Sequence, residues 1–105
     1  MKQLSVIFLL LGLPIIVCAQ GVTGTWSTAS STGFTARTDF ATAAVNGKIY
    51  VIGGAKGNTN LSTMNVYDPS TDTWSTPTTT GTFTPRWSLG AAVVGGKIYV
   101  MGGVN

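Results

Sequence analysis

Two segments of the chain, offset by 49 residues, are nearly identical. Residues 37–54 read RTDFATAAVNGKIYVIGG and residues 86–103 read RWSLGAAVVGGKIYVMGG, so that 10 of 18 aligned positions match without a gap. A repeat of this period is typical of architectures in which each repeat is one supersecondary unit. Because one unit cannot bury its own apolar faces, the sequence predicts neighbouring units that cover one another.

The first repeat has the pattern of four short antiparallel strands. Asn46-Gly47 is a strong signal for a two-residue hairpin, since both central residues need a positive φ. The strand after it, KIYVI, is apolar on both faces, which predicts cover on both sides. Residues 55–62 are expected to form a polar loop, and Asp68 with Pro69 a turn. The expected strands are residues 41–45, 48–52, 63–67 and 73–76.

The second repeat contains only the hairpin, with expected strands at residues 89–94 and 97–101 around Gly95-Gly96. Residues 25–28 (TWST) repeat residues 73–76, so Trp26 marks a lone fourth strand ahead of the complete unit. The order is therefore a fourth strand, one whole unit and the first half of another.

The first residues precede the repeats and predict a secretory signal peptide at residues 1–19. Lys2 gives a positive start, residues 4–17 form an apolar run, and small residues precede a cleavage point at Gln20. The run of about 14 residues is short of the roughly 20 that a transmembrane anchor needs. Lipid attachment at Cys18 is the other alternative, which the bulky preceding valine disfavours. We expect a secreted protein, periplasmic or extracellular, that does not stay on the membrane after cleavage.

Composition excludes several function classes. Without Lys2 the chain carries five basic and three acidic residues, a net charge of +2 that is too weak and scattered to predict nucleic-acid binding. It has no histidine, and its single cysteine, Cys18, belongs to the signal segment. We therefore expect no disulfide, no metal site, no cofactor and no catalytic triad. Asp68 and Asp72 are expected to cap backbone amides in a turn, and Asp39 to end an exposed loop.

Taken together, the motifs resemble the kelch repeat. An arginine, a hairpin, a double glycine, Val-Tyr-Asp-Pro and Thr-Asp-Thr-Trp follow one another in the order and spacing of that family. The resemblance implies an all-β fold, a β-propeller in which each repeat forms one four-stranded antiparallel blade. The chain would supply about one and three-quarter blades of it. The structural positions of the motif are Gly53, Gly54, Tyr67, Asp68, Trp74, Gly102, Gly103 and Trp26.

The resemblance also implies a division of the chain. Residues 20–36 would hold the N-terminal strand of a closing blade, residues 37–85 a complete blade, and residues 86–105 the first half of a second. Propellers typically have four to eight blades. The blade count favours an N-terminal fragment of a longer gene product. A short chain whose copies assemble a ring through open strand edges, and a decayed product that does not fold stably, are the alternatives.

One rim of the blade is the candidate binding surface. The loop between the second and third strands and the crossover into the next blade share this rim. Arginine binds carboxylates, and Trp87 would stack on a sugar or a peptide side chain. Alternatively, both arginines bond the backbone or acids between blades, which their repetition favours. The candidate rim residues are Arg37, Asn58, Asn60, Arg86 and Trp87. Asn60 also begins a glycosylation sequon, relevant only in a eukaryotic secretory pathway.

We expect a secreted binding or interaction module for a protein or a carbohydrate, non-catalytic by itself. The alternative is the N-terminal part of a secreted carbohydrate-active kelch enzyme, for example one similar to the sialic-acid epimerases, which draw site residues from many blades. The copper oxidases among kelch proteins need His ligands and a cross-linked Cys, which this chain lacks outside the signal segment. The double glycines precede no helix, so they do not form a phosphate loop.

Overall fold

The computed structural model describes residues 3–10, 13–20 and 23–105, and side chains from residue 24 onward. This described part is all β, as predicted, and holds no helix that could cross a membrane. Part of the predicted signal peptide, residues 1–2 and 11–12, lies outside the described residues. Its cleavage and the export of the chain stay predictions.

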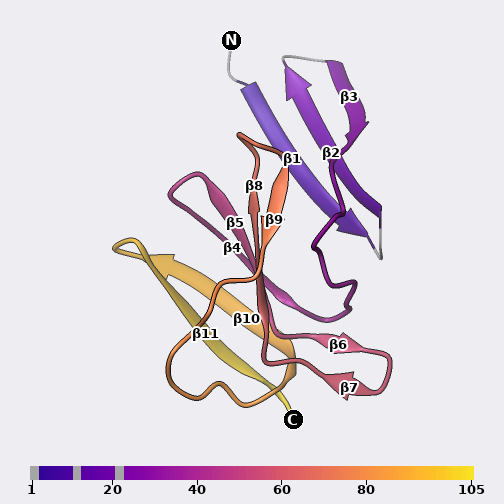
Figure 1. Cartoon of the computed structure of the whole chain (residues 1–105). Coiled ribbons are helices and arrows are strands. Elements are labelled where there is room, and N and C mark those ends of the chain that lie inside the picture. Colours follow the sequence, from indigo (N-terminus) through magenta and orange to yellow (C-terminus); the bar gives the residue numbers. More distant parts are fainter. Residues whose placement is uncertain (1–2, 11–12, 21–22) are drawn as a thin grey trace.

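The N-terminal strands form a three-stranded antiparallel sheet of their own (Figure 1). Its order is β1 (Gln3–Leu10), β2 (Leu13–Gln20) and β3 (Thr23–Thr28). The predicted strand around Trp26 is present as β3, and Trp26 lies opposite Val17 of β2. The predicted role of this strand in closing a ring is untested.

A four-stranded antiparallel sheet follows, and it is the predicted blade. Its strands are neighbours in chain order, β4-β5-β8-β9, which makes a simple up-and-down sheet. Asn46 and Gly47 connect β4 to β5 with φ values of 51° and 71°, the positive pair that a type I′ turn requires. The strands are β4 (Ala41–Val45), β5 (Lys48–Ile52), β8 (Met64–Asp68) and β9 (Thr73–Ser75).

The loop predicted at residues 55–62 contains a small hairpin, which corrects that prediction. β6 (Ala55–Lys56) and β7 (Thr59–Asn60) pair across a turn at Gly57 and Asn58. Gly57 supplies the positive φ, 58°, that closes so tight a turn. The Leu61 amide donates to the Gly54 carbonyl at 2.8 Å, so the hairpin is closed at its base. Figure 1 shows it projecting from one end of the blade.

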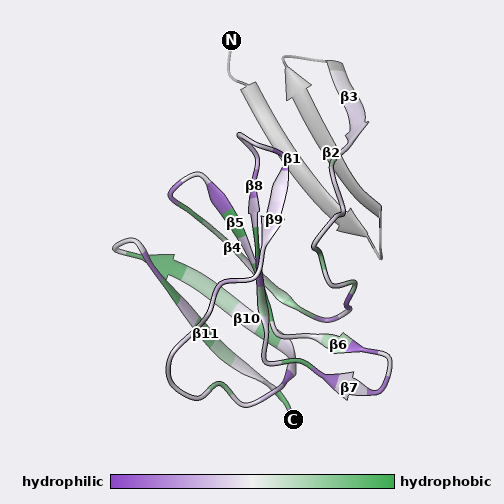
Figure 2. Ribbon diagram, viewed as in Figure 1, coloured by the Kyte–Doolittle hydropathy of each residue, from purple (hydrophilic) through white to green (hydrophobic). Residues whose placement is uncertain are grey.

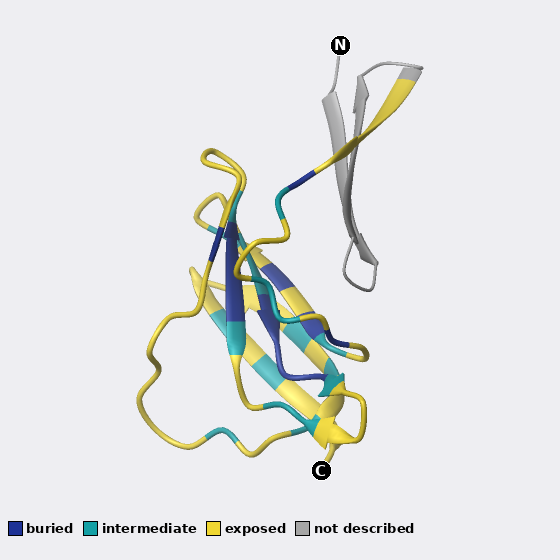
Figure 3. Cartoon of the chain, turned by 45° about the vertical axis from the view of Figure 1, so that its right-hand side comes forward, coloured by how far each residue is buried: buried dark blue, intermediate teal, exposed yellow. Residues whose placement is uncertain are grey.

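One face of the blade carries the buried core. Val51, Tyr67 and Trp74 are buried there with Ala29, from the segment that follows β3. The rings of Tyr67 and Trp74 lie 5.0 Å apart, and Phe34 covers Trp74 at 4.5 Å. Such aromatic pairs add about 0.5–1.5 kcal/mol beyond their burial. Figure 3 shows the buried residues gathered mainly in this sheet.

The other face of the blade meets a second, two-stranded sheet. β10 (Trp87–Val94) and β11 (Lys97–Val104) pair antiparallel, and β10 packs along β4. Ala41 and Ala43 are buried on β4, where small side chains let the second sheet approach. Both faces of β5 are therefore covered, as predicted from its apolar pattern. Figure 2 shows the hydrophobic colour running along β10 and β11.

Both strands of the second hairpin extend further than predicted at its open end, where β10 begins and β11 ends. Trp87 pairs with Val104, so the ladder continues past Met101 through Gly102 and Gly103. The outer part of this sheet is apolar and exposed, with Val94 exposed by 65% and Met101 by 57%.

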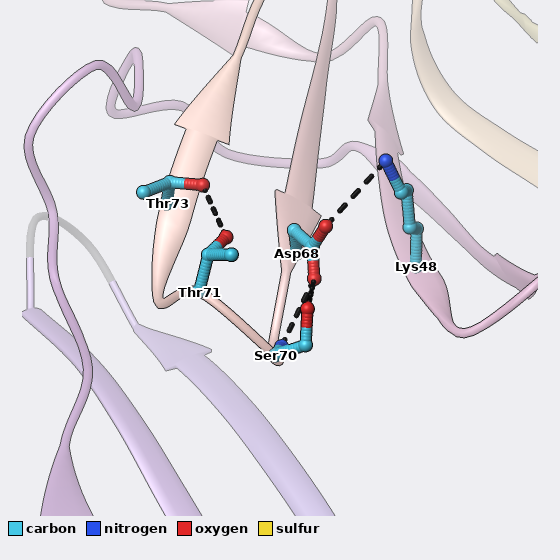
Figure 4. Close-up of polar contacts among 5 residues, drawn as sticks. All are labelled: Lys48, Asp68, Ser70, Thr71 and Thr73. Carbon is cyan, nitrogen blue, oxygen red and sulfur yellow. Dashed lines mark hydrogen bonds and ion pairs between the residues drawn. The ribbon is translucent and has the colours of Figure 1, made fainter.

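The Asp68 turn caps its own backbone, as predicted (Figure 4). The Asp68 carboxylate accepts hydrogen bonds from the backbone amide of Ser70 at 2.9 Å and from its hydroxyl at 2.6 Å. It also pairs with Lys48 at 3.5 Å. The Ser70 hydrogen bonds, then Lys48, hold the pKa of Asp68 below its usual value. This turn lies at the end of the sheet opposite to the β6–β7 hairpin.

Candidate functional site at the blade rim

Arg37 belongs to the scaffold and is not available to a ligand at the rim. Its side chain is 2% exposed. All five of its N–H donors are used, on the carbonyls of Thr35, Gly53 and Thr63, the Thr63 hydroxyl and the Asn65 amide oxygen. Burial lowers the pKa of Arg37, although a guanidinium remains charged at neutral pH. The candidate rim role of Arg37 is thus wrong in this structure, and the alternative of bonding to backbone holds.

Arg86 repeats part of the same arrangement. Its Nε donates to the Thr84 carbonyl at 3.3 Å and its Nη1 to the Gly102 carbonyl at 2.9 Å. These bonds have the same sequence offsets as those of Arg37 to Thr35 and Gly53. The first Arg of each repeat therefore ties the strand entry to the first glycine of its double glycine.

The double glycines allow three chain segments to meet at the rim. Gly54 has a φ of 91°, and a Cβ there would lie 2.5 Å from the Thr38 carbonyl oxygen. Instead of a side chain, the Gly54 amide meets the Arg86 carbonyl in a 2.9 Å hydrogen bond. In this way the end of β5, the entry to β4 and the start of β10 come within backbone contact. Only glycine fits this geometry without displacing its neighbours.

Further backbone hydrogen bonds fix the rim. Thr38 and Ala55 exchange two bonds, at 2.8 and 2.9 Å, which attach the β6–β7 hairpin to the entry of β4. The Ser88 amide donates to the Asp39 carbonyl at 2.8 Å, which attaches β10 to the same point. Asp39 is held with a φ of 54°, in the left-handed region that non-glycine residues seldom occupy.

These contacts surround a hollow of about 320 Å³ that opens at the rim. It brings together three of the five predicted rim residues, Asn58, Asn60 and Trp87, and leaves out both arginines. It adds Asp39, which was predicted only to end an exposed loop. Trp87 is 37% exposed, so part of its indole remains available to a ligand. We call this feature the rim hollow: Asp39, Ala55, Gly57, Asn58, Asn60 and Trp87.

A larger cavity, of about 420 Å³, lies between the two sheets. Tyr50 and Ile52 of the blade and Ile98 and Val100 of the second sheet line it, together with Phe83 of the crossover. No charged residue lines it. Its position between packed apolar strands makes it part of the inter-sheet packing, whereas the rim hollow carries the polar and aromatic groups that orient a ligand.

Within the described residues, no group of three or more His, Cys, Asp or Glu side chains is placed to hold a metal ion. Two of the three aspartates form hydrogen bonds that stabilise the fold. Asp68 caps its turn, and the Oδ1 of Asp72 accepts from the Tyr67 hydroxyl at 2.7 Å and from the Ser30 amide at 2.8 Å.

The four-stranded up-and-down blade, with a second sheet packed face to face on it, defines the class of a β-propeller built from repeats. A family model, the KLHDC2/KLHL20/DRC7 Kelch-repeats domain, matches residues 15–105. The chain therefore belongs to the kelch-repeat family. The match begins inside the segment predicted as a signal peptide.

Two known proteins illustrate the relationship. The chain is 54% identical over 41 residues to the F-box/kelch-repeat protein At1g67480 of Arabidopsis thaliana, over 38% of this chain and 11% of that protein. The solved structure of YjhT is similar over 90% of this chain with a TM-score of 0.76. Their identity of 24% shows a shared fold alone. The chain spans 11% and 28% of the lengths of these two proteins.

Proposed function

We propose that the chain is an exported kelch-repeat binding module that recognises a protein or a carbohydrate at the rim hollow and is not catalytic by itself. The observation that carries the proposal is the convergence of Asn58, Asn60 and Trp87 from two blades on one hollow. Its volume of about 320 Å³ is within the range of ligand pockets, at the small end. Backbone hydrogen bonds hold its walls, so little ordering is needed on binding.

The test is a pair of matched aromatic truncations assayed on peptide and glycan arrays with the full chain. Trp87→Ala removes the aromatic wall of the hollow, while Tyr99→Ala removes an aromatic side chain that is 49% exposed on β11 and does not line the hollow. We expect array binding to fall about tenfold or more in the first variant and less than about twofold in the second. Equal binding by Trp87→Ala and the unchanged chain would contradict the proposal.

Export is tested separately. Expression with a secretory system should release a product whose mass corresponds to residues 20–105, because cleavage is predicted before Gln20. Recovery of the intact 105-residue chain from the cytoplasm alone would reject export. It would leave the rim proposal standing.

A carbohydrate-active kelch enzyme, similar to the sialic-acid epimerases, is the second candidate, favoured by the Asp39 carboxylate beside Trp87 in the hollow. Asp39 is the only titratable side chain that lines the hollow, so a second acid or base would have to come from outside the hollow. Interconversion of N-acetylneuraminic acid anomers, followed by NMR, tests this candidate. A rate equal to that in buffer excludes catalysis by this chain.

Self-association belongs to the same proposal as a further partner. The edges and outer face of β10 and β11 are apolar and exposed, as in strands that pair with another chain. Sedimentation of the purified chain should show species larger than the monomer. A strict monomer would reject this part.

A further inference from the structure

We infer that the rim hollow selects a cationic group, the guanidinium or ammonium of an Arg or Lys side chain on a protein ligand. In this inference the Asp39 carboxylate binds the positive charge. This inference rests on the proposed function of the rim as a binding site and specifies the chemistry of its ligand. The charge, the fold and the lining of the hollow each support it.

The first support is the state of the three carboxylates. Asp68 pairs with Lys48 and Ser70, and Asp72 accepts from Tyr67 and Ser30. In the part of the chain that the structure describes, the Asp39 carboxylate forms no ion pair or hydrogen bond. It is also the one charged side chain that lines the hollow. The hollow therefore carries a negative charge that no side chain lining it neutralises.

The second support is that the fold does not require a carboxylate at this position. Ser88 is the counterpart of Asp39 in the second repeat, 49 residues later. Its φ is 56°, against 54° for Asp39, so a serine adopts the same left-handed backbone. The two residues are also joined to each other by the hydrogen bond from the Ser88 amide to the Asp39 carbonyl. The repeat dictates the backbone here, and the acidic side chain is an addition of the first repeat alone.

The third support is the chemistry of the lining. A cation is attracted both to a carboxylate and to the face of an indole, and Asp39 and Trp87 line the same hollow. The side-chain amides of Asn58 and Asn60 offer carbonyl oxygens that accept the remaining N–H donors. The guanidinium of Arg86 is directed to the Thr84 and Gly102 carbonyls, so it does not neutralise Asp39. An anionic ligand would meet a carboxylate and no cation there.

The experiment uses the ¹⁵N-labelled full chain and the indole N–H signal of Trp87, assigned with a Trp87→Phe variant. The probes are Nα-acetyl-arginine methylamide and its neutral isostere, Nα-acetyl-citrulline methylamide. We expect a saturable shift of the Trp87 signal with the arginine probe and a response at least about tenfold weaker with citrulline, the factor that a charge-assisted contact supplies.

Asp39→Asn is the decisive variant, because asparagine keeps the shape of the side chain and tolerates a positive φ. It should weaken arginine binding about tenfold. Asp39→Ser, which introduces the residue of the second repeat, should also weaken arginine binding about tenfold. It shows whether the loss is caused by removal of the carboxylate or by a property specific to asparagine. Asp68→Asn makes the same charge change in the turn at the opposite end of the blade and should leave binding unchanged.

The outcomes separate the two proposals. Equal affinity for arginine and citrulline, or unchanged arginine binding by Asp39→Asn, overturns the cation inference while the rim still binds. A shift of Trp87 with neutral saccharides but not with arginine also overturns it and leaves the proposed function intact. If the Trp87 indole signal does not shift with either probe, with the saccharides or with the array peptides, both the inference and the proposed function are overturned.

Discussion

The two hairpins of this chain share most of their sequence and differ in what covers them. Val51 of β5 is fully buried and Ile52 is 7% exposed, whereas Met101, the counterpart of Ile52 on β11, is 57% exposed. Arg37 is 2% exposed, while its counterpart Arg86 is only partly buried. The first hairpin has β8 on its edge and packed segments on both faces, and the second has neither β8 nor β9 equivalents among the described strands. The repeat therefore encodes the hairpin, and the neighbours confer its burial.

What the hairpins keep in common is local. Each has a two-residue turn of positive φ, an arginine bonded to the first glycine carbonyl, and a left-handed residue two positions after that arginine. These features depend on contacts within about one repeat, so they form in both copies. Substitutions at equivalent positions can separate the local contribution from that of the neighbours.

The arginine pair should give the largest difference. Arg37→Ala would remove the buried hydrogen bonds to the Gly53 and Thr63 carbonyls and to the Asn65 amide oxygen, and should lower the free energy of unfolding by about 3–5 kcal/mol. Arg86→Ala loses two exposed bonds and should cost less than about 1 kcal/mol. Urea unfolding followed by tryptophan fluorescence measures both.

Arg37→Lys sharpens this comparison. Lysine keeps the charge but offers three donors from one point, so it cannot replace the five-donor fork. It should remain clearly destabilised. If Arg37→Lys is as stable as the unchanged chain, or if both alanine variants lose the same free energy, the difference in burial does not control stability.

Much of this arrangement could be predicted from the sequence, because it depends on short-range rules. Asn46-Gly47 fixes a hairpin through its positive φ values, and the two apolar faces of KIYVI require cover on both sides. The hairpin at Gly57 and Asn58 gives no periodic pattern in the sequence, because its strands are only two residues long. The signal available was the Gly-Asn pair itself.

The site was less predictable than the fold. The strand order alone predicts that Trp87, Asn58 and Asn60 lie at one rim, because topology places the loops there, and the structure brings them to one hollow. The sequence predicts only an exposed loop end at Asp39, and it does not show that this residue lines a hollow together with Trp87. That placement depends on long-range contacts, such as the hydrogen bond from the Ser88 amide to the Asp39 carbonyl.

The double glycines should give the next largest difference. Gly53→Ala, the counterpart of Gly102→Ala, adds a Cβ at a φ of 64° that lies 2.9 Å from the Arg86 carbonyl oxygen and overlaps the Leu89 side chain, and should cost about 2–4 kcal/mol from strain and overlap together. Gly102→Ala has a φ of 76°, but its Cβ would meet nothing within 4 Å, so only the backbone cost of about 1–2 kcal/mol applies. Thermal unfolding of the two variants compares them directly. A larger loss in Gly102→Ala would mean that the junction between the sheets is looser than these contacts indicate.

Tyr67 should give the smallest difference, and one that depends on pH. Burial, then its hydrogen bond to Asp72, raises the pKa of Tyr67 to about 12. An unfolded tyrosine titrates near 10, so this stabilisation of the blade is complete below about pH 10 and is lost as the pH rises toward 12. The second hairpin has no counterpart of Tyr67, and Tyr67→Phe removes the titrating group at a cost of about 1 kcal/mol at neutral pH. Urea midpoints between pH 9 and about pH 12 should therefore fall more steeply for the unchanged chain than for Tyr67→Phe. Parallel curves for the two would show that other groups cause the alkaline loss and that the Tyr67–Asp72 bond does not.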